Sequence, residues 1–350
     1  MTVRVIQWAT GPVGAAALRE VIDSPELELV GVFAYSANKI GVDAGALVNR
    51  GPTGVFVTGD KAEILAQPAD LVLHAASKAF GDDTTGDVVA LLESGKNVIT
   101  TTSYNHLPTY GADACARITD ACLRNGVRFH AAGEHPGYVF ERLATSLTAL
   151  SQRVDRITVQ EFVDCSGISQ RSMLVDLMGM GKRPEDITID SPMFRAVSLQ
   201  YEQALAATAD VLGLDIDRIE RGVETTTHTS DVVVRCATLP AGTVVAQRLT
   251  WTAYRRGSRV LVAEELWSTS TELLGWQVPG ENQFLVRVRI DGSPALQLDL
   301  TIGNEPIADL DTSGGQLAVA MTAVRAIPDV LRAPPGVVIA PVFGAYQWQS

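Results

Sequence analysis

The sequence predicts two domains: an α/β domain with a doubly wound parallel sheet, then an α+β domain with a largely antiparallel sheet. Up to about residue 140, β-branched runs alternate with helical segments, as in parallel strands joined by crossover helices. After Arg153, strand-like runs follow one another and are joined by short turns containing glycine. The 350 residues also exceed the ~150 of one typical domain. We expect residues 1–140, completed by 312–350, to form the first domain and 141–311 the second.

The first domain is expected to contain strands at residues 3–9, 27–35, 54–58, 71–75, 97–102 and 127–132. Helices are expected at 13–22, 84–94 and 111–125. A glycine directly follows the second and third of these helices, and glycine just past the last helical residue is a common helix stop. This alternation predicts helices on both faces of the sheet.

The second domain is expected to begin with a strand at 156–164 and helices at 172–179 and 198–212. Strands are then expected at 232–239, 243–254, 259–267, 283–290 and 295–302, and a helix at 315–331 returns to the first domain. The two helices can cover one face of this sheet, and a second subunit could cover the other. We therefore expect a homodimer formed through this domain.

The first strand leads into a glycine-containing loop, residues 9–14 (ATGPVG), and an alanine-rich helix. Loop amides and a helix N-terminus can hold a pyrophosphate there, so the pattern predicts a Rossmann-type dinucleotide-binding domain. Ala9 replaces the first glycine of the usual GxGxxG, which we interpret as a mild departure. A plain strand-to-helix turn is the alternative. The loop residues expected to bind the cofactor are Thr10, Gly11, Pro12, Val13 and Gly14.

The end of the second strand bears on which dinucleotide is bound. NAD-selective domains usually carry Asp or Glu there, ~20 residues past the loop, to hold the ribose 2′-hydroxyl. Residues 33–39 (FAYSANK) contain neither, whereas Ser36 and Lys39 suit a 2′-phosphate. We expect NADP, or use of both NADP and NAD; the alternative is that Lys39 is simply solvated. Further cofactor contacts are expected from Asn38, Ala75, Ala76, Thr101 and Thr102.

Composition excludes several other classes of function. The net charge of −12 argues against nucleic acid or an anionic membrane as partner. No run approaches the ~20 apolar residues of a membrane span, and no signal peptide precedes the first strand, so we expect a cytoplasmic protein. The four cysteines form no CxxC pair, and no cluster has metal-ligand spacing, so we expect no metal.

Several segments together resemble a known superfamily. They are the loop near residue 10 and residues 26–32 (ELELVGV), 70–75 (DLVLHA), 95–101 (GKNVITT) and 133–138 (GEHPGY). They resemble the dihydrodipicolinate reductase-like superfamily, and within it 2,4-diaminopentanoate dehydrogenase and the native amine dehydrogenases most. The resemblance implies NAD(P)H-dependent reduction of a C=N bond, or reductive amination of a carbonyl with ammonia. It also implies an active site between the domains and a dimer formed through the second domain.

The chain departs from those amine dehydrogenases after the fifth strand. They carry a glutamate there, where the substrate amine binds, whereas residues 101–107 (TTSYNHL) contain no carboxylate. The family segment Gly-x-Asn-Pro-Gly after the sixth strand here contains Glu134, within residues 133–137 (GEHPG). We hypothesise that Glu134 substitutes for the missing glutamate. The alternative is that it pairs with Arg142 on the surface.

Ligands of open α/β sheets bind beyond the carboxyl ends of the strands. Three segments there offer the polar residues Ser77, Lys78, Tyr104, Asn105, His106, Glu134 and His135. An iminium acceptor calls for a carboxylate such as Glu134, and a carbonyl acceptor for a proton donor, which Tyr104, His106 or His135 could supply. Substrate contacts are expected from Asn105, Glu161 and Met178.

Each of these assignments has a structural alternative. His106 could be a polar loop residue, His135 a helix cap, Met178 a core side chain and His74 a satisfied strand histidine.

The leading functional interpretation is therefore an NAD(P)H-dependent amine or imine oxidoreductase acting on a small carbonyl or amine substrate. An ammonia-independent ketone or aldehyde reductase is the second, and a non-catalytic dinucleotide-binding sensor the third. NADPH oxidation measured with and without ammonia separates the three.

Overall fold

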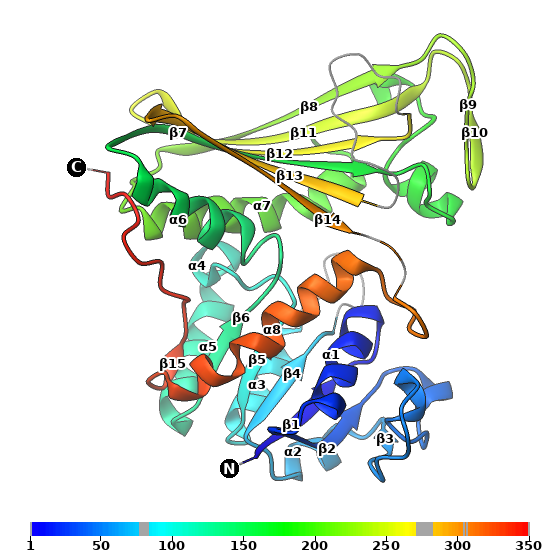
Figure 1. The fold of residues 1–350 in the computed structure, drawn as a ribbon, viewed down its shortest axis with the longest axis vertical. Helices are drawn as coiled ribbons and strands as arrows, with labels where there is room; N and C mark the ends of the chain where they lie inside the picture. The colour runs from blue at the N-terminus through cyan, green and yellow to red at the C-terminus, as the bar shows by residue number, and fades with distance from the viewer. Residues whose placement is uncertain (1, 77–83, 271–282, 304, 306, 349–350) are drawn as a thin grey trace. The chain divides into compact units, whose positions relative to one another are not determined.

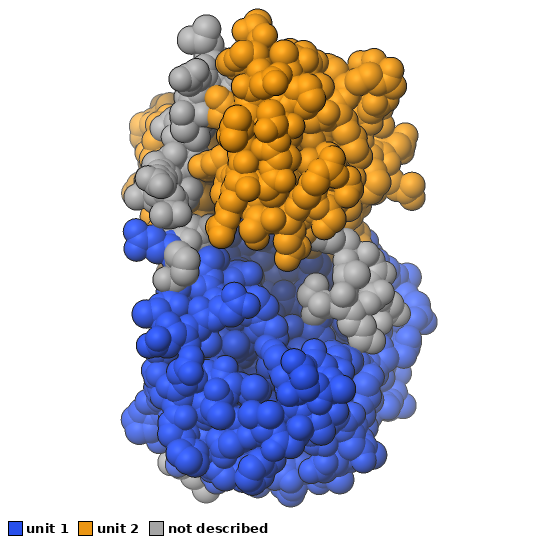
Figure 2. Space-filling view, turned by 90° about the vertical axis from the view of Figure 1, so that its right-hand side faces the viewer, with its two compact units in different colours: residues 1–138, 305–341 blue, residues 139–304, 342–350 orange. Residues whose placement is uncertain are grey.

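The computed structural model of the chain describes residues 2–76, 84–270, 283–303, 305 and 307–348. The chain forms two compact units, shown in Figure 2: residues 1–138 with 305–341 make unit 1, and residues 139–304 with 342–350 make unit 2. The last residues lie in unit 2 and not, as expected, in the first domain. The reason is that the Tyr346 N–H bonds to the Thr148 hydroxyl at 2.9 Å and the Trp348 N–H to the Leu212 carbonyl at 3.0 Å.

Unit 1 contains a seven-stranded sheet in the order β15-β6-β5-β4-β1-β2-β3, and every neighbouring pair is parallel. The predicted doubly wound α/β fold is thus confirmed (Figure 1). Its strands are β1 (Val3–Trp8), β2 (Leu27–Phe33), β3 (Val57–Thr58), β4 (Leu71–His74), β5 (Asn97–Thr100), β6 (Arg128–Ala131) and β15 (Gly336–Val337). Its helices are α1 (Pro12–Asp23), α2 (Lys61–Ala66), α3 (Thr85–Glu93), α4 (Leu107–Tyr110), α5 (Ala112–Asn125) and α8 (Gly314–Arg332).

Alternating side chains of the strands fill two cores on opposite faces of this sheet. In β4, Leu71 and Leu73 pack with α1 and α8, whereas Val72 packs with α3 and α5. Helix α8 begins at a capping box in which Ser313 and Gln316 satisfy each other's backbone amides. The C-terminal helix therefore completes unit 1 by covering α1.

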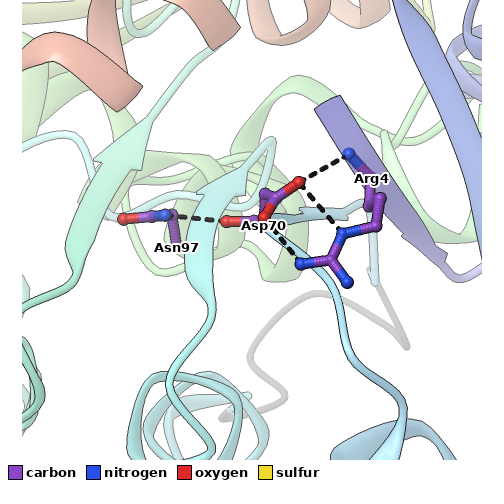
Figure 3. Close-up of polar contacts among 3 residues, drawn as sticks. All are labelled: Arg4, Asp70 and Asn97. Atoms are coloured by element: carbon purple, nitrogen blue, oxygen red, sulfur yellow. Dashed lines mark hydrogen bonds and ion pairs between the residues drawn. The ribbon is translucent and has the colours of Figure 1, made fainter. Parts of the chain in front are cut away.

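The amino ends of the central strands are joined by side chains. Figure 3 shows Asp70 accepting hydrogen bonds from the backbone and guanidinium of Arg4, at 2.8 to 3.3 Å, while the Asn97 amide donates to the Asp70 carbonyl at 2.7 Å. Asn97 also accepts from the Arg128 N–H at 2.9 Å. These bonds connect β1, β4, β5 and β6 at the edge opposite the predicted ligand site.

Unit 2 contains a six-stranded sheet in the order β14-β13-β7-β12-β11-β8. β7 and β12 run parallel and the other neighbours antiparallel, as the largely antiparallel prediction requires. The strands are β7 (Arg153–Asp164), β8 (Arg218–Thr227), β11 (Val244–Arg255), β12 (Ser258–Ser268), β13 (Gln283–Ser293) and β14 (Leu296–Gly303). The hairpin β9 (Val232–Val234) and β10 (Ala237–Leu239) is separate. A π-helical segment, Val139–Ala144, leads into α6 (Thr145–Leu147). A second, Ser172–Leu177, lies between β7 and α7 (Pro192–Val211).

Helix α7 packs on one face of this sheet, where Tyr201 stacks on Trp251 with ring centroids 4.1 Å apart. It begins at Pro192, earlier than expected, because proline is well suited to the first helical turn. The stretch predicted as one strand at 232–239 is instead the hairpin β9–β10.

Candidate functional site

The carboxyl ends of β1, β2, β4, β5 and β6 share one edge of the unit 1 sheet. The strand order turns back between β1 and β4, since β1 continues to β2 on one side and the chain resumes with β4 on the other. This is the switch point at which doubly wound sheets bind ligands.

The loop after β1 is shaped to receive a phosphate. A Cβ on Gly14 would lie 2.2 Å from the Ala9 carbonyl oxygen, so this position requires glycine for the helix to approach the strand. A Cβ on Gly11 would meet nothing within 4 Å, so backbone there faces open space. Gly11 precedes α1 and provides no side-chain cap, which leaves the amides of the first helical turn to an anion. The loop thus fits a dinucleotide pyrophosphate.

Ala9 is more strained than the sequence interpretation allowed. Its φ of +70° is a left-handed conformation that costs ~1–2 kcal/mol for a residue with a Cβ. The buried side chain of Gln7 steadies this turn, because its amide donates to the Ala9 carbonyl at 2.9 Å. Gln7 was missed in the sequence, although a polar residue between the apolar Ile6 and Trp8 was the available signal.

Lys39 contacts the phosphate loop. Its ammonium donates to the Thr10 carbonyl at 2.6 Å and to the Thr10 hydroxyl at 3.2 Å. Ser36 and Asn38 lie beside it on the same turn and are exposed. The structure therefore brings together the loop and the cation predicted to read a 2′-phosphate, and Lys39 is not merely solvated.

Tyr35 is a further residue at this edge, and sequence reasoning missed it. It directly follows the end of β2, and its hydroxyl accepts from the Trp8 indole at 3.1 Å and donates to Asp87 at 2.9 Å. Burial raises the pKa of Tyr35 to about 12, so the phenol stays protonated. Lys61 pairs with the same Asp87.

The ends of β4 and β5 meet through polar side chains. His74 Nδ1 shares a hydrogen bond with the Thr100 hydroxyl at 2.9 Å, and Thr100 contacts the Thr102 hydroxyl at 2.6 Å. Burial lowers the pKa of His74 to about 4, so it is a neutral strand histidine. Ala75, Ala76 and Thr101 lie at the same strand ends, where the cofactor contacts were predicted. Ser77 and Lys78 lie outside the described residues.

The predicted proton donor Tyr104 does not suit that role. Its side chain is buried, and its hydroxyl is 3.0 Å from the hydroxyls of both Thr84 and Thr85 at the start of α3. Its ring packs against Tyr110 and Phe129. We therefore correct this assignment: Tyr104 belongs to the core of unit 1.

His106 is the N-terminal cap of α4. Its Nδ1 accepts from the Thr109 N–H at 3.3 Å and lies 2.8 Å from the Thr109 hydroxyl. This contact fixes the imidazole at the loop after β5 and makes a capping role its clearest function.

The loops after β5 and β6 are in contact. A Cβ on Gly137, whose φ is +121°, would lie 2.8 Å from the Asn105 amide nitrogen. A Cβ on Gly133 would lie 2.2 Å from the Pro136 carbonyl oxygen, so this turn needs both glycines. Glu134 and His135 belong to this turn and are partly buried, and the His135–Pro136 peptide is cis. Asn105 of the loop after β5 therefore lies against the turn after β6 that contains Glu134 and His135.

No helix begins at Pro136 in the part of the chain that is described, so the helix-cap alternative for His135 is wrong. Arg142, the alternative partner of Glu134, belongs to unit 2.

In unit 2, Glu161 belongs to a buried acidic cluster. The Tyr201 hydroxyl donates to Glu161 at 3.3 Å and also to Glu265, which accepts from the Trp267 indole at 2.6 Å. Burial raises the pKa of Glu161 to about 7; the hydrogen bond with Glu265 opposes this rise and the charge of Glu141 adds to it. Sequence reasoning singled out Glu161 alone, because its partners come from α7 and β12.

Met178 lies in the core of unit 2, with 6% of its surface exposed, and its carbonyl accepts from the Gln247 amide at 2.6 Å. Met178 is therefore a core side chain, which was the alternative to a substrate contact. Among the described residues, no group of three or more His, Cys, Asp or Glu side chains is arranged to bind a metal. Over the same residues, no helix is both long and apolar enough to span a membrane.

Known proteins are similar to this chain along most of its length. Residues 4–110 match the family model of the dihydrodipicolinate reductase N-terminus. A Streptomyces virginiae protein named amine dehydrogenase is 27% identical over 349 residues, which cover 95% of this chain and 94% of that protein. The solved amine dehydrogenase of Mycobacterium smegmatis has the same fold, with a TM-score of 0.72, 20% identity, and 97% and 95% of the two chains covered.

A gentamicin A biosynthesis protein solved in complex with NAD is more distant, with a TM-score of 0.54 and 14% identity over 94% of this chain and 87% of that one. These likenesses confirm the resemblance to the dihydrodipicolinate reductase-like proteins and the two-part fold.

Proposed function

We propose that this chain, an NAD(P)-dependent dehydrogenase related to the dihydrodipicolinate reductases and amine dehydrogenases, reductively aminates a small ketone or aldehyde, or reduces an imine. The observation that carries the proposal is the set of strand ends in unit 1, where the phosphate loop, Lys39 and Glu134 occupy the edge used for ligands. The full-length likeness to an amine dehydrogenase supports the C–N chemistry.

The dinucleotide would be held by backbone and by one cation. The open backbone at Gly11 and the first turn of α1 would receive the pyrophosphate, and Lys39 would exchange its contacts with Thr10 for a 2′-phosphate. A nicotinamide cofactor, when bound, supplies or accepts the hydride. We propose a preference for NADP over NAD on the basis of Lys39 and the missing acidic residue after β2.

Glu134 is proposed to act on the substrate amine. A carboxylate there stabilises the positive charge of an iminium and can accept a proton from the amine nitrogen. Asn105 comes from the neighbouring loop and contacts the same turn, which supports a role for its amide in orienting the substrate. Orientation matters because hydride transfer needs the reacting atoms at ~3–3.5 Å.

The test is NADPH oxidation with small ketones and aldehydes, with and without ammonia. The proposal expects turnover that depends on ammonia. Glu134→Gln should lower amination by at least about a hundredfold while leaving NADPH affinity unchanged. Glu93→Gln, at an exposed glutamate of α3, is the matched control and should stay fully active. An active Glu134→Gln would remove Glu134 from the mechanism.

An ammonia-independent ketone or aldehyde reductase is the second candidate. It is favoured by the lack of a carboxylate in residues 101–107, while His106 and His135 could donate a proton to a carbonyl oxygen. Turnover that does not require ammonia would establish it in place of the amination proposal. Dinucleotide binding without turnover on any of these compounds would instead indicate a sensor.

We also propose that the chain dimerises through the unit 2 sheet. Phe162, Leu266 and Leu285 form a small buried apolar cluster of their own, outside the large core under α7. A second subunit packed there would cover this face of the sheet. Light scattering after size exclusion would test it: a monomer at micromolar concentration contradicts the proposal.

A further inference from the structure

Unit 2 contains a cavity that the proposed dehydrogenase does not use. Its volume is about 560 Å³, within the ~300–1,000 Å³ typical of small-molecule sites. It lies at the start of β7, beside the turn between β11 and β12 and the C-terminal segment of the chain. Figure 1 shows the β11–β12 turn (yellow) and the C-terminal segment (red) at the same end of unit 2. Asp291 of β13 completes the lining, so the cavity is formed by four separate stretches of one unit.

The walls of this cavity are rich in arginine. The lining arginines are Arg156, Arg255, Arg256 and Arg259, and the lining carboxylates are Asp155 and Asp291. Three of these arginines fall within five residues of a chain that has 28 basic and 40 acidic residues overall. The lining therefore carries a local excess of positive charge in a protein whose net charge is −12.

The acidic side chains near the cavity already have partners. Arg156 binds Asp291, with its Nε at 2.9 Å and its terminal nitrogen at 2.6 Å from one carboxylate oxygen. Asp155 pairs with Arg153 at 2.9 Å. Within the described residues, neither Arg256 nor Arg259 forms an ion pair, and both are exposed; Arg259 acts only at longer range on Glu220, whose pKa is lowered mainly by its hydrogen bond from Arg218 and slightly by the charge of Arg259. Their guanidinium groups are available to an anionic ligand.

The turn that carries these arginines is held by the backbone. Arg256 and Gly257 both have positive φ, at +49° and +77°, as a two-residue hairpin turn requires. Asp217 accepts from the Arg256 N–H, and its own N–H donates to the Tyr254 carbonyl at 2.7 Å. Arg256 thus lies in a turn of fixed conformation and Arg259 follows it on β12, so the backbone loses little entropy when a ligand binds.

The cavity also has an aromatic wall. Trp348 lines it and is half-buried, and the ring of Tyr346 stands perpendicular to the Trp348 ring with their centroids 5.2 Å apart. Guanidinium groups bind phosphate oxygens in pairs of hydrogen bonds, and an indole face can stack on a flat ring. We propose that this cavity binds a nucleotide-like metabolite, its phosphates held by Arg256 and Arg259 and its ring against Trp348.

The test titrates the full chain carrying Gly14→Ala, which is expected not to bind a dinucleotide in unit 1, with pyrophosphate and with ADP by calorimetry. We expect one ADP per chain, binding more tightly than pyrophosphate and more weakly as salt rises. The double variant Arg256→Gln/Arg259→Gln should weaken both probes at least about tenfold. Trp348→Ala should weaken ADP and leave pyrophosphate unchanged.

The matched control is Arg195→Gln/Arg289→Gln, which removes two exposed charges from unit 2 outside the cavity. Its affinity should stay within about twofold of the parent chain. Binding that is absent, or that falls equally in both double variants, would overturn the site. ADP no tighter than pyrophosphate, with no effect of Trp348→Ala, would overturn the assignment of a ring-bearing ligand. None of these results depends on dehydrogenase activity, so the proposed function stands or falls separately.

Discussion

Replacing Glu161 with glutamine is expected to stabilise unit 2 at alkaline pH. Glu161 on β7 lies directly beside Glu265 on β12, and their side chains are 7% and 6% exposed. Burial of the carboxyl, helped by the nearby charge of Glu141, raises the pKa of Glu161 to about 7, although the hydrogen bond with Glu265 lowers it. A glutamine keeps the shape, cannot ionise, and its amide can donate to Glu265.

The size of the effect follows from the pKa. Raising a carboxyl pKa from 4.5 to about 7 corresponds to ~3 kcal/mol between the two protonation states. The folded chain holds a proton on Glu161 that the unfolded chain releases above pH 4.5. This contribution to stability is therefore complete below pH 4.5 and is lost as the pH rises through 7. Glu161→Gln does not lose this stability as the pH rises, because glutamine does not ionise.

The assay is guanidinium unfolding followed by tryptophan fluorescence at pH 5 and pH 8.5, because Trp251 and Trp267 lie in the same unit. Glu161→Gln should be more stable than the parent by up to ~3 kcal/mol at pH 8.5 and little changed at pH 5. Glu265→Gln is the control. It loses the carboxylate that accepts from Tyr201 and Trp267, so it should be less stable at both pH values. A Glu161→Gln protein that is less stable at pH 8.5, or equally shifted at both pH values, would refute the reasoning.

Three further predictions concern the phosphate loop. Gly14→Ala should destabilise the chain by ~1–3 kcal/mol and abolish NADPH binding, because the new Cβ meets the Ala9 carbonyl oxygen at 2.2 Å. Gly11→Ala places its Cβ in open space, so it should weaken NADPH binding and leave the melting temperature unchanged. Equal losses of melting temperature in the two variants would contradict this. Lys39→Ala should weaken NADP⁺ binding at least about tenfold and NAD⁺ binding by less than about threefold, measured by calorimetry; equal losses would show that Lys39 acts only on Thr10. Ala9→Gly removes the ~1–2 kcal/mol that a residue with a Cβ loses in the left-handed conformation. The greater backbone entropy of glycine in the unfolded chain costs roughly 0.5–1 kcal/mol, which is less. The melting temperature should therefore rise by about 1–2 °C, and a fall would contradict the reasoning.

The parts of the fold that sequence reasoning recovered are those with strong local patterns. The alternation of apolar runs and capped helices was enough for the unit 1 sheet and for residues 9–14. The strands it missed lack such patterns: β8 (RIERGVETTT) is an edge strand with a mostly polar surface, and β15 has two residues. Both take their conformation from a neighbouring strand that is distant in sequence.

For the candidate site, the sequence located some residues correctly along the chain but not the directions of their side chains. Residue type and position were sufficient to place Lys39 and Glu134 at strand ends. They could not tell that the Tyr104 hydroxyl turns to Thr84 and Thr85, since a tyrosine after a strand can face the ligand or the core. Nor could they show that Gln7 supports Ala9, because that contact depends on the left-handed backbone.

The chain passes between the two units three times, after residues 138, 304 and 341. Neither unit can therefore be excised as one continuous stretch. A protein ending at residue 138 would lose the strand β15 and the helix α8, and it would expose the apolar face of α1 that Ala320, Val324 and Ile327 now cover. Exchange of the nucleotide-binding part between relatives must accordingly transfer residues 1–138 and 305–341 together, because a single crossover after residue 138 would build unit 1 from residues of both parents.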